Sequence, residues 1–84
     1  MEKITRFLEL PKEIIYNLPK ITLIGNLQVL IENHQGIIEY STGKIRISVN
    51  TGEIEILGRD LAICNITSDE IYLDGDISGL KYHR

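Results

Sequence analysis

The stretch that decides the fold runs from residue 36 to residue 59 and reads GIIEYSTGKIRISVNTGEIEILGR. It contains the same device twice: an alternating apolar strand ends at Thr-Gly, and another alternating strand follows. The first turn is Thr42-Gly43 and the second is Thr51-Gly52. Alternation of apolar and polar residues places one face of a strand in a core and the other face in water. The stretch therefore predicts a β-meander with strands over 37–41, 44–50 and 53–57.

Parity predicts the register of this meander, because directly opposed residues share a face and a slip of one residue would reverse every side chain. We expect two-residue loops at both Thr-Gly turns, which oppose Tyr40 to Ile45, Ile38 to Ile47, Ile47 to Ile56 and Val49 to Ile54. One face then carries Ile38, Tyr40, Ile45, Ile47, Val49, Ile54 and Ile56. The opposite face carries Glu39 opposite Arg46 and Ser48 opposite Glu55, together with Leu30, Ile37 and Leu57. Threonine at the first loop position fits poorly, because the favoured hairpin turns require positive φ there.

The remainder of the chain predicts further short strands over 21–24, 27–32 and 61–65, with a loop over 33–36. The last segment is either one bent strand over 71–82 or a hairpin that turns at Gly75-Asp76. A short helix is expected over about 11–18, since Pro11 suits a first helical position and Pro19 ends the helix. The predicted fold class is all-β, mainly an antiparallel meander or small sandwich, with one short N-terminal helix. A β-solenoid-like stack is the alternative.

Length and charge restrict the class of protein. The chain has 84 residues and predicts a single β domain over 1–84, in which residues 1–9 are free to be flexible. Its net charge of −3 argues against nucleic acid, which usually needs a concentrated basic patch. No apolar run is long enough to insert as a transmembrane span, and the first residues do not resemble a signal peptide. We therefore expect a cytoplasmic protein.

The residues that could carry chemistry do not form a recognisable constellation. His34 and His83 lie far apart, and the one cysteine, Cys64, has no spacing typical of a metal site. Cys64 follows Ala62-Ile63 in a strand, where a thiol is more often a core residue than a nucleophile. Asp74-Gly75-Asp76 is interpreted as a turn rather than part of a calcium loop. The sequence predicts no catalytic residue, no cofactor and no metal ligand, and hence no enzyme.

Four segments have an order and spacing that invite comparison with known families. They cover 18–26 (LPKITLIGN), 31–40 (IENHQGIIEY), 45–47 with 52–58 (IRI and GEIEILG) and 71–77 (IYLDGDI). The first two are fairly specific in combination, whereas the later strand segments are generic. Together they resemble the YabP/YqfC family of sporulation proteins, and the YqfC branch most closely, over nearly the whole chain.

The resemblance implies a non-enzymatic protein of endospore-forming bacteria that acts by protein–protein interaction or assembly. The YqfC-like branch is associated with the mother-cell programme, and its gene typically neighbours one for a membrane-anchored sporulation protein. The expected partner is therefore a membrane-anchored protein, and a homo-oligomer is a further expectation. The expected location is the mother-cell cytoplasm, peripheral at the forespore-facing membrane.

The resemblance supplies no catalytic residues, but it draws attention to one loop. The candidate interaction or special-loop residues are Glu32, Asn33, His34, Gly36, Ile37 and Leu57. The first four match the family segment, and the other two are apolar residues on the face opposite the predicted core. Asn33 and Gly36 also suit a loop that needs left-handed backbone angles, which is a purely structural interpretation. A small-ligand or metal-binding module centred on Asn33 and His34 is the alternative function.

Overall fold

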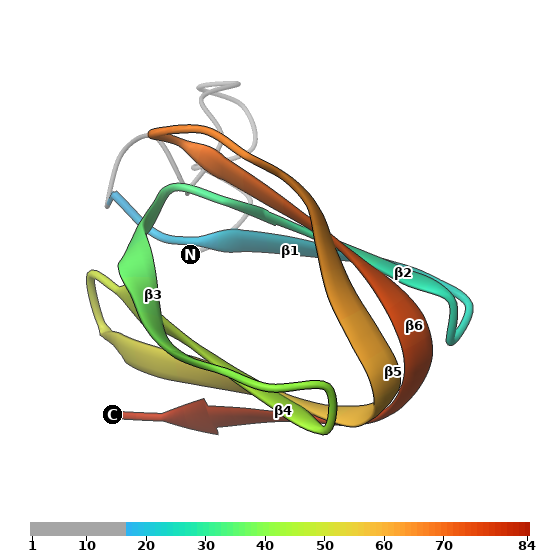
Figure 1. Ribbon diagram of the computed structural model, residues 1–84. Helices are drawn as coiled ribbons and strands as arrows, with labels where there is room; N and C mark the ends of the chain where they lie inside the picture. Colours follow the sequence, from blue (N-terminus) through green and yellow to red (C-terminus); the bar gives the residue numbers. More distant parts are fainter. Residues whose placement is uncertain (1–16) are drawn as a thin grey trace, which may run out of the picture.

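The computed structural model describes residues 17–84, which form six β-strands in one antiparallel sheet (Figure 1). The strands are β1 (Lys20–Ile24), β2 (Gln28–Glu32), β3 (His34–Tyr40), β4 (Lys44–Val49), β5 (Gly52–Ile66) and β6 (Glu70–His83). Their order across the sheet is β1-β2-β6-β5-β4-β3. Strands β3 to β6 thus follow one another as a meander, and β2 adds to the far side of β6.

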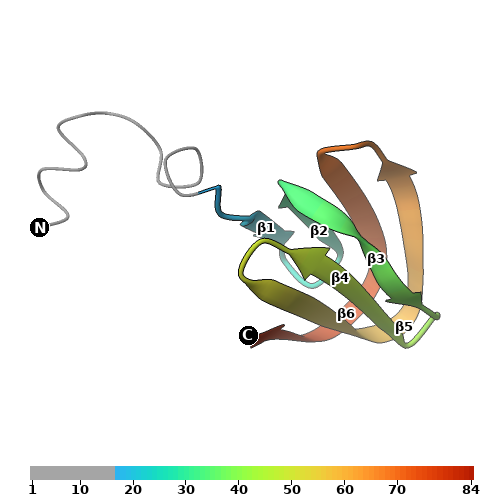
Figure 2. The same cartoon turned by 90° about the vertical axis from the view of Figure 1, so that its left-hand side faces the viewer.

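The sheet curls around its own inner face because β5 and β6 are long and bend together (Figures 1 and 2). The first half of β5 pairs with β4 and the second half does not, whereas the first half of β6 pairs with β2. The long β5–β6 hairpin therefore connects a β1–β2 half to a β3–β4 half. This arrangement replaces the predicted small sandwich with a single curled sheet, and its antiparallel neighbours rule out the solenoid-like stack.

The bend lies at Gly58-Arg59-Asp60, between the predicted strands over 53–57 and 61–65. Asp60 has a left-handed φ of 54°, and the β5–β6 register shifts on both sides of Gly58-Arg59. Leu61 follows the bend with only 1% of its surface exposed, and its side chain packs directly against Gly75 of β6. The turn between β3 and β4 closes over this bend, since the amide of Leu61 donates to the carbonyl of Thr42 at 2.9 Å. Residues of the types that favour turns therefore bend a single strand here, and they do not form a loop between two strands.

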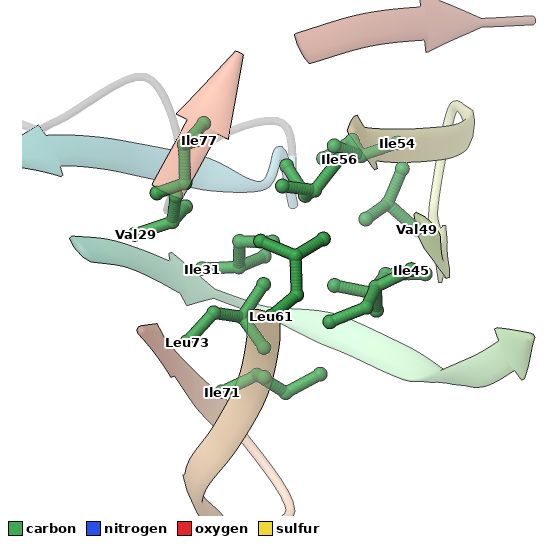
Figure 3. Packing of buried hydrophobic residues seen from close by; sticks show 11 residues of the cluster. Val29, Ile31, Ile45, Val49, Ile54, Ile56, Leu61, Ile71, Leu73 and Ile77 are labelled. Atoms are coloured by element: carbon green, nitrogen blue, oxygen red, sulfur yellow. The ribbon is translucent and has the colours of Figure 1, made fainter. Parts of the chain in front are cut away.

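The core consists of aliphatic side chains from every strand except β1 and β3 (Figure 3). Burying one such side chain contributes roughly 1.5–3 kcal/mol, so this cluster is the main favourable term for so short a chain. Its members are Val29, Ile31, Ile45, Ile47, Val49, Ile54, Ile56, Leu61, Ile71, Leu73 and Ile77. Ile21, Ile37, Ile63 and Leu80 pack against this cluster.

The register predicted for the meander is confirmed next to the β3–β4 turn, but it is wrong by two residues between β4 and β5. Tyr40 pairs with Ile45 and Glu39 with Arg46, as expected. Between β4 and β5, however, Ile47 pairs with Ile54 and Val49 pairs with Gly52. The loop is therefore Asn50-Thr51, which moves the register by two residues and preserves the faces. Neither loop residue has positive φ, so threonine is not strained there.

The first strand of the meander contains irregularities that the sequence did not predict. The β3–β4 register shifts between His34 and Ile37 and again between Ile37 and Glu39. A bulge inserts an unpaired residue and re-aims its neighbours. Consequently Ile37, and not Ile38, pairs with Ile47 and packs against the core, while Ile38 is 47% exposed. Both the core position of Ile38 and the outer-face position of Ile37 were therefore wrong, and Tyr40 is also half exposed.

Several element boundaries also differ from the expectations. The predicted loop over 33–36 is a corner of one residue, because β3 begins at His34. The strands over 53–57 and 61–65 are one strand, and 71–82 is a bent strand rather than a hairpin. Most of the predicted helix over 11–18, and all of 1–9, lies outside the described residues; Asn17 and Leu18 are not helical. Residues 17–84 contain no helix that is long and apolar enough to cross a membrane.

Replacement of Gly75 by alanine should destabilise the fold by roughly 2–4 kcal/mol. Gly75 has a φ of 147°, and a Cβ atom there would lie 2.9 Å from Cα of Leu61. Urea unfolding monitored by circular dichroism would measure the change. Gly79→Ala is the matched control in the same strand, because its Cβ would meet only Leu57 at an ordinary 3.7 Å. Equal stability losses in the two variants would contradict the packing of Leu61 against Gly75.

Candidate functional site

Four of the predicted site residues lie together at the corner between β2 and β3. Asn33 is the residue that separates the two strands, and its φ of 67° lies in the left-handed region that asparagine tolerates. Its Nδ2 donates to Oδ1 of Asn17 at 2.9 Å and to the carbonyl of Leu18 at 3.0 Å. Its backbone N–H donates to the carbonyl of Asp69 at 2.7 Å. Asn33 therefore connects the approach to β1, the corner itself and the β5–β6 turn.

His34 uses both ring nitrogens inside the fold. Nδ1 accepts a hydrogen bond from the amide of Gly36 at 2.9 Å, and Nε2 lies 2.8 Å from the carbonyl of Thr67. A carbonyl oxygen accepts and never donates, so the proton is assigned to Nε2 of a neutral ring. A metal ion at either nitrogen would have to displace one of these contacts. The geometry therefore favours a structural role for His34 at this corner over a role as a ligand.

The other predicted site residues do not form one cluster. Glu32 ends β2, where it pairs with Lys20 on β1 and with Glu70 on β6. Ile37 packs against the core. Leu57 lies on β5 between Lys44 and Gly79, on the face opposite the core. The structure thus brings Glu32, Asn33, His34 and Gly36 together and leaves Leu57 at a different place on the sheet.

The outer face of the β3–β5 part of the sheet carries a charged cluster centred on Arg46. Its guanidinium binds Glu53 through two bonds, at 2.7 Å from Nε and 2.9 Å from Nη2, and binds Glu39 at 3.2 Å. These contacts hold the pKa of Glu53 below its ordinary value. His83 lies 2.8 Å from Oε1 of Glu55 on the same face. Such partly exposed pairs add little stability individually, so this face is better described as a polar surface than as a source of stability.

A separate apolar region, which the sequence analysis missed, lies where the β1–β2 hairpin meets β6. Leu23, Ile24 and Leu27 are 51%, 57% and 65% exposed. Leu23 and the hairpin turn form a pocket of about 190 Å³ with Ile77–Leu80 of β6, which we call the β1–β6 notch. The available signal was the consecutive Leu23-Ile24 directly before the Gly25-Asn26 turn. Alternation along the predicted strand over 27–32 puts Leu27 on the face of Val29 and Ile31, but it does not show that the core ends before Leu27.

Cys64 does not occupy the core position that its neighbours suggested. It lies on the outer face with Ala62, because Leu61 and Ile63 alternate toward the core, and it is exposed. Its thiol lies against the Asp74 carboxylate, and the hydrogen bond and charge of Asp74 raise the pKa of the thiol. A nucleophilic cysteine needs the opposite shift. Within residues 17–84, no three side chains of the metal-binding types come together.

These features describe a small all-β protein with a tightly bonded corner, a charged outer face and an apolar notch. The family comparison identifies the class: the YabP family model matches residues 17–84, and the chain belongs to this family. Membership suggests a sporulation-associated protein. The uncharacterized protein YqfC of Bacillus subtilis (strain 168) is 37% identical over 79 residues, which cover 94% of this chain and 85% of that protein. No solved structure matches the chain.

Replacement of Asn33 should separate the backbone and side-chain contributions of the corner. Asn33→Ala loses two side-chain hydrogen bonds and places alanine at positive φ, so we expect a loss of roughly 2–3 kcal/mol. Asn33→Gly removes the same bonds without the backbone strain, so its loss of stability should be about 1 kcal/mol smaller than that of Asn33→Ala. Chemical unfolding of both variants provides the measurement. If alanine and glycine cost the same, the left-handed conformation contributes nothing to stability.

Alkylation of Cys64 should report its contact with Asp74. Because the Asp74 carboxylate disfavours the thiolate, Asp74→Asn should move the pH midpoint of the iodoacetamide reaction to lower pH and raise the rate at pH 8 several-fold. Asp76→Asn is the matched control, since Asp76 binds Asn26 and Arg59 instead. Rates would be followed by mass spectrometry of the intact protein. Identical pH profiles for the wild type and Asp74→Asn would refute the contact.

Proposed function

We propose that this protein acts during endospore formation by binding another protein, and that it has no catalytic activity. The observation that carries the proposal is membership of the YabP family across residues 17–84. The proposed compartment is the mother cell, and the proposed partner is a membrane-anchored sporulation protein encoded beside it. This chain would then work at the forespore-facing membrane as a peripheral component.

Two structural features support a role based on contact. Leu23, Ile24 and Leu27 are large apolar side chains that lie at least half exposed on one hairpin, and clustered exposure of this kind is typical of interaction surfaces. The side chains that could take part in chemistry are engaged in other contacts. His34 is hydrogen-bonded at both ring nitrogens, and the raised pKa of Cys64 favours its neutral thiol. For the same reason, the alternative of a ligand module at Asn33 and His34 has less support.

A deletion strain and a fluorescent fusion provide the test in spore-forming cells. We expect loss of the gene to impair spore formation and the fusion to concentrate at the forespore boundary of the mother cell. Affinity purification of a tagged full-length chain from sporulating cells should retain the membrane-anchored protein encoded beside it. Uniform fluorescence, with no retained membrane protein and normal spores, would exclude the proposed function. Light scattering of the purified chain would show separately whether it self-associates.

A further inference from the structure

Among the strands of residues 17–84, none pairs with one edge of the last third of β6. On one side β6 pairs with β5 from Ile71 to His83. On the other side, the pairing of β6 with β2 stops at Asp74. The turn of the β1–β2 hairpin then makes two further hydrogen bonds with β6. There Gly75 and Ile77 donate to the carbonyls of Leu27 and Asn26 at 3.2 and 2.8 Å. Beyond Ile77, no strand within residues 17–84 lies on that side, and Figures 1 and 2 show β6 continuing to the C-terminus along the margin of the sheet.

The β1–β6 notch lies beside the start of this edge. Leu23 lines the notch from β1, and Ile77 and Leu80 line it from β6. Tyr82, which pairs with Ile54 and so shares the core face, is 44% exposed further along. A strand entering in line with β2 would find unpaired backbone along residues 78–83. Its inward side chains would cover Leu23, Leu80 and Tyr82, all of which keep exposed apolar surface.

Two cationic side chains lie exposed at this edge although the whole chain is acidic. Lys81 and Arg84 are exposed, and neither has an acidic partner within residues 17–84. Glu55, which stands opposite Lys81 in the register, binds His83 instead. Outward side chains of an added strand would lie beside these unpaired cations. Carboxylates at those positions would complement the charge, and lysines would be repelled.

We propose that the edge of β6 over residues 78–83 binds an extended segment of a partner protein, in which apolar and acidic residues alternate. The segment adds to the sheet as a strand in line with β2, with its apolar side chains over the β1–β6 notch and its acidic side chains toward Lys81 and Arg84. This inference rests on the proposed function, because it names the surface and the kind of segment through which the protein makes contact.

The test uses a fluorescein-labelled peptide of sequence Glu-Val-Glu-Ile-Glu-Val-Glu-Ile and the full-length protein. In fluorescence anisotropy titrations at low salt, we expect this peptide to bind and the version with lysine in place of glutamate to bind at least tenfold more weakly. Hydrogen exchange measured by NMR should show protection of amides within residues 78–83 when the acidic peptide is bound. Amides on the free edge of β3 should not change, although that edge is also unpaired.

Two matched pairs of variants locate the binding surface without disturbing the core. Leu23→Ser should weaken peptide binding about tenfold, whereas Leu27→Ser removes an equally large exposed side chain outside the notch and should have no effect. Lys81→Glu should weaken binding about fivefold, whereas Lys44→Glu makes the same change in net charge on β4 and should not. Heteronuclear NMR spectra of each variant would confirm that the fold is retained.

Several results would overturn the inference. These results are no binding of the peptide, binding without protection of residues 78–83, or an equal change in peptide affinity for both variants of each pair. Doubling of the mass with residues 78–83 protected in the absence of peptide would instead assign the edge to a second copy of this chain. Retention of the membrane-anchored protein by Leu23→Ser and Lys81→Glu at wild-type levels would reject this edge while the proposed function stands. Failure of the wild type to retain that protein, together with uniform fluorescence and normal spores, would reject the proposed function.

Discussion

The contact of Leu61 with Gly75 is the constraint on which the rest of this structure depends. It lies where β5 and β6 bend together, and it admits no side chain on the β6 partner. Without the bend, the two ends of a hairpin of this length would point away from each other and could not share a core. With it, Ile71 and Leu73 from one half belong to the same core as Ile45 and Ile56 from the other, and Leu61 lies between them (Figure 3). One close contact therefore allows a single sheet to enclose an apolar interior.

The sequence predicted the buried faces well because alternation reports burial directly. Ile45, Ile47, Val49, Ile54 and Ile56 were assigned to one face, and all of them are in the core. Alternation does not report bulges, however, since a bulge changes the count of residues without changing their type. Ile38 was misplaced for this reason, because it lies at a register shift between β3 and β4. Cys64 was misplaced because its apolar neighbours, and not the alternation from Leu61, were used to assign it to the core. The strands predicted over 53–57 and 61–65 are one strand, because the residue types of Gly58-Arg59-Asp60 favour a bend within a strand as well as a turn between strands.

The candidate site shows a similar division between what local sequence can and cannot reveal. The Asn33-His34-Gly36 combination correctly marked an unusual backbone, since Asn33 and Gly36 both have positive φ. The contacts of Asn33 with Asn17 and of His34 with Thr67 could not have been predicted, because they depend on which turns the curled sheet brings to that corner. The β1–β6 notch was missed because it arises from the unequal lengths of β2 and β6. No single segment encodes such a difference.

The pairing of β2 with β6 also affects how this chain is made. During synthesis β1 and β2 emerge before the other strands, yet β2 can pair with β6 only after residues 70–74 have followed. Local hairpins form quickly, whereas contacts between distant segments slow folding because the intervening chain must first be ordered. On the ribosome, the β3–β5 meander can form while the apolar side chains of β1 and β2 are still exposed. Within residues 17–84, β6 is translated after the other five strands and completes the sheet, and its arrival joins the β1–β2 hairpin to the meander.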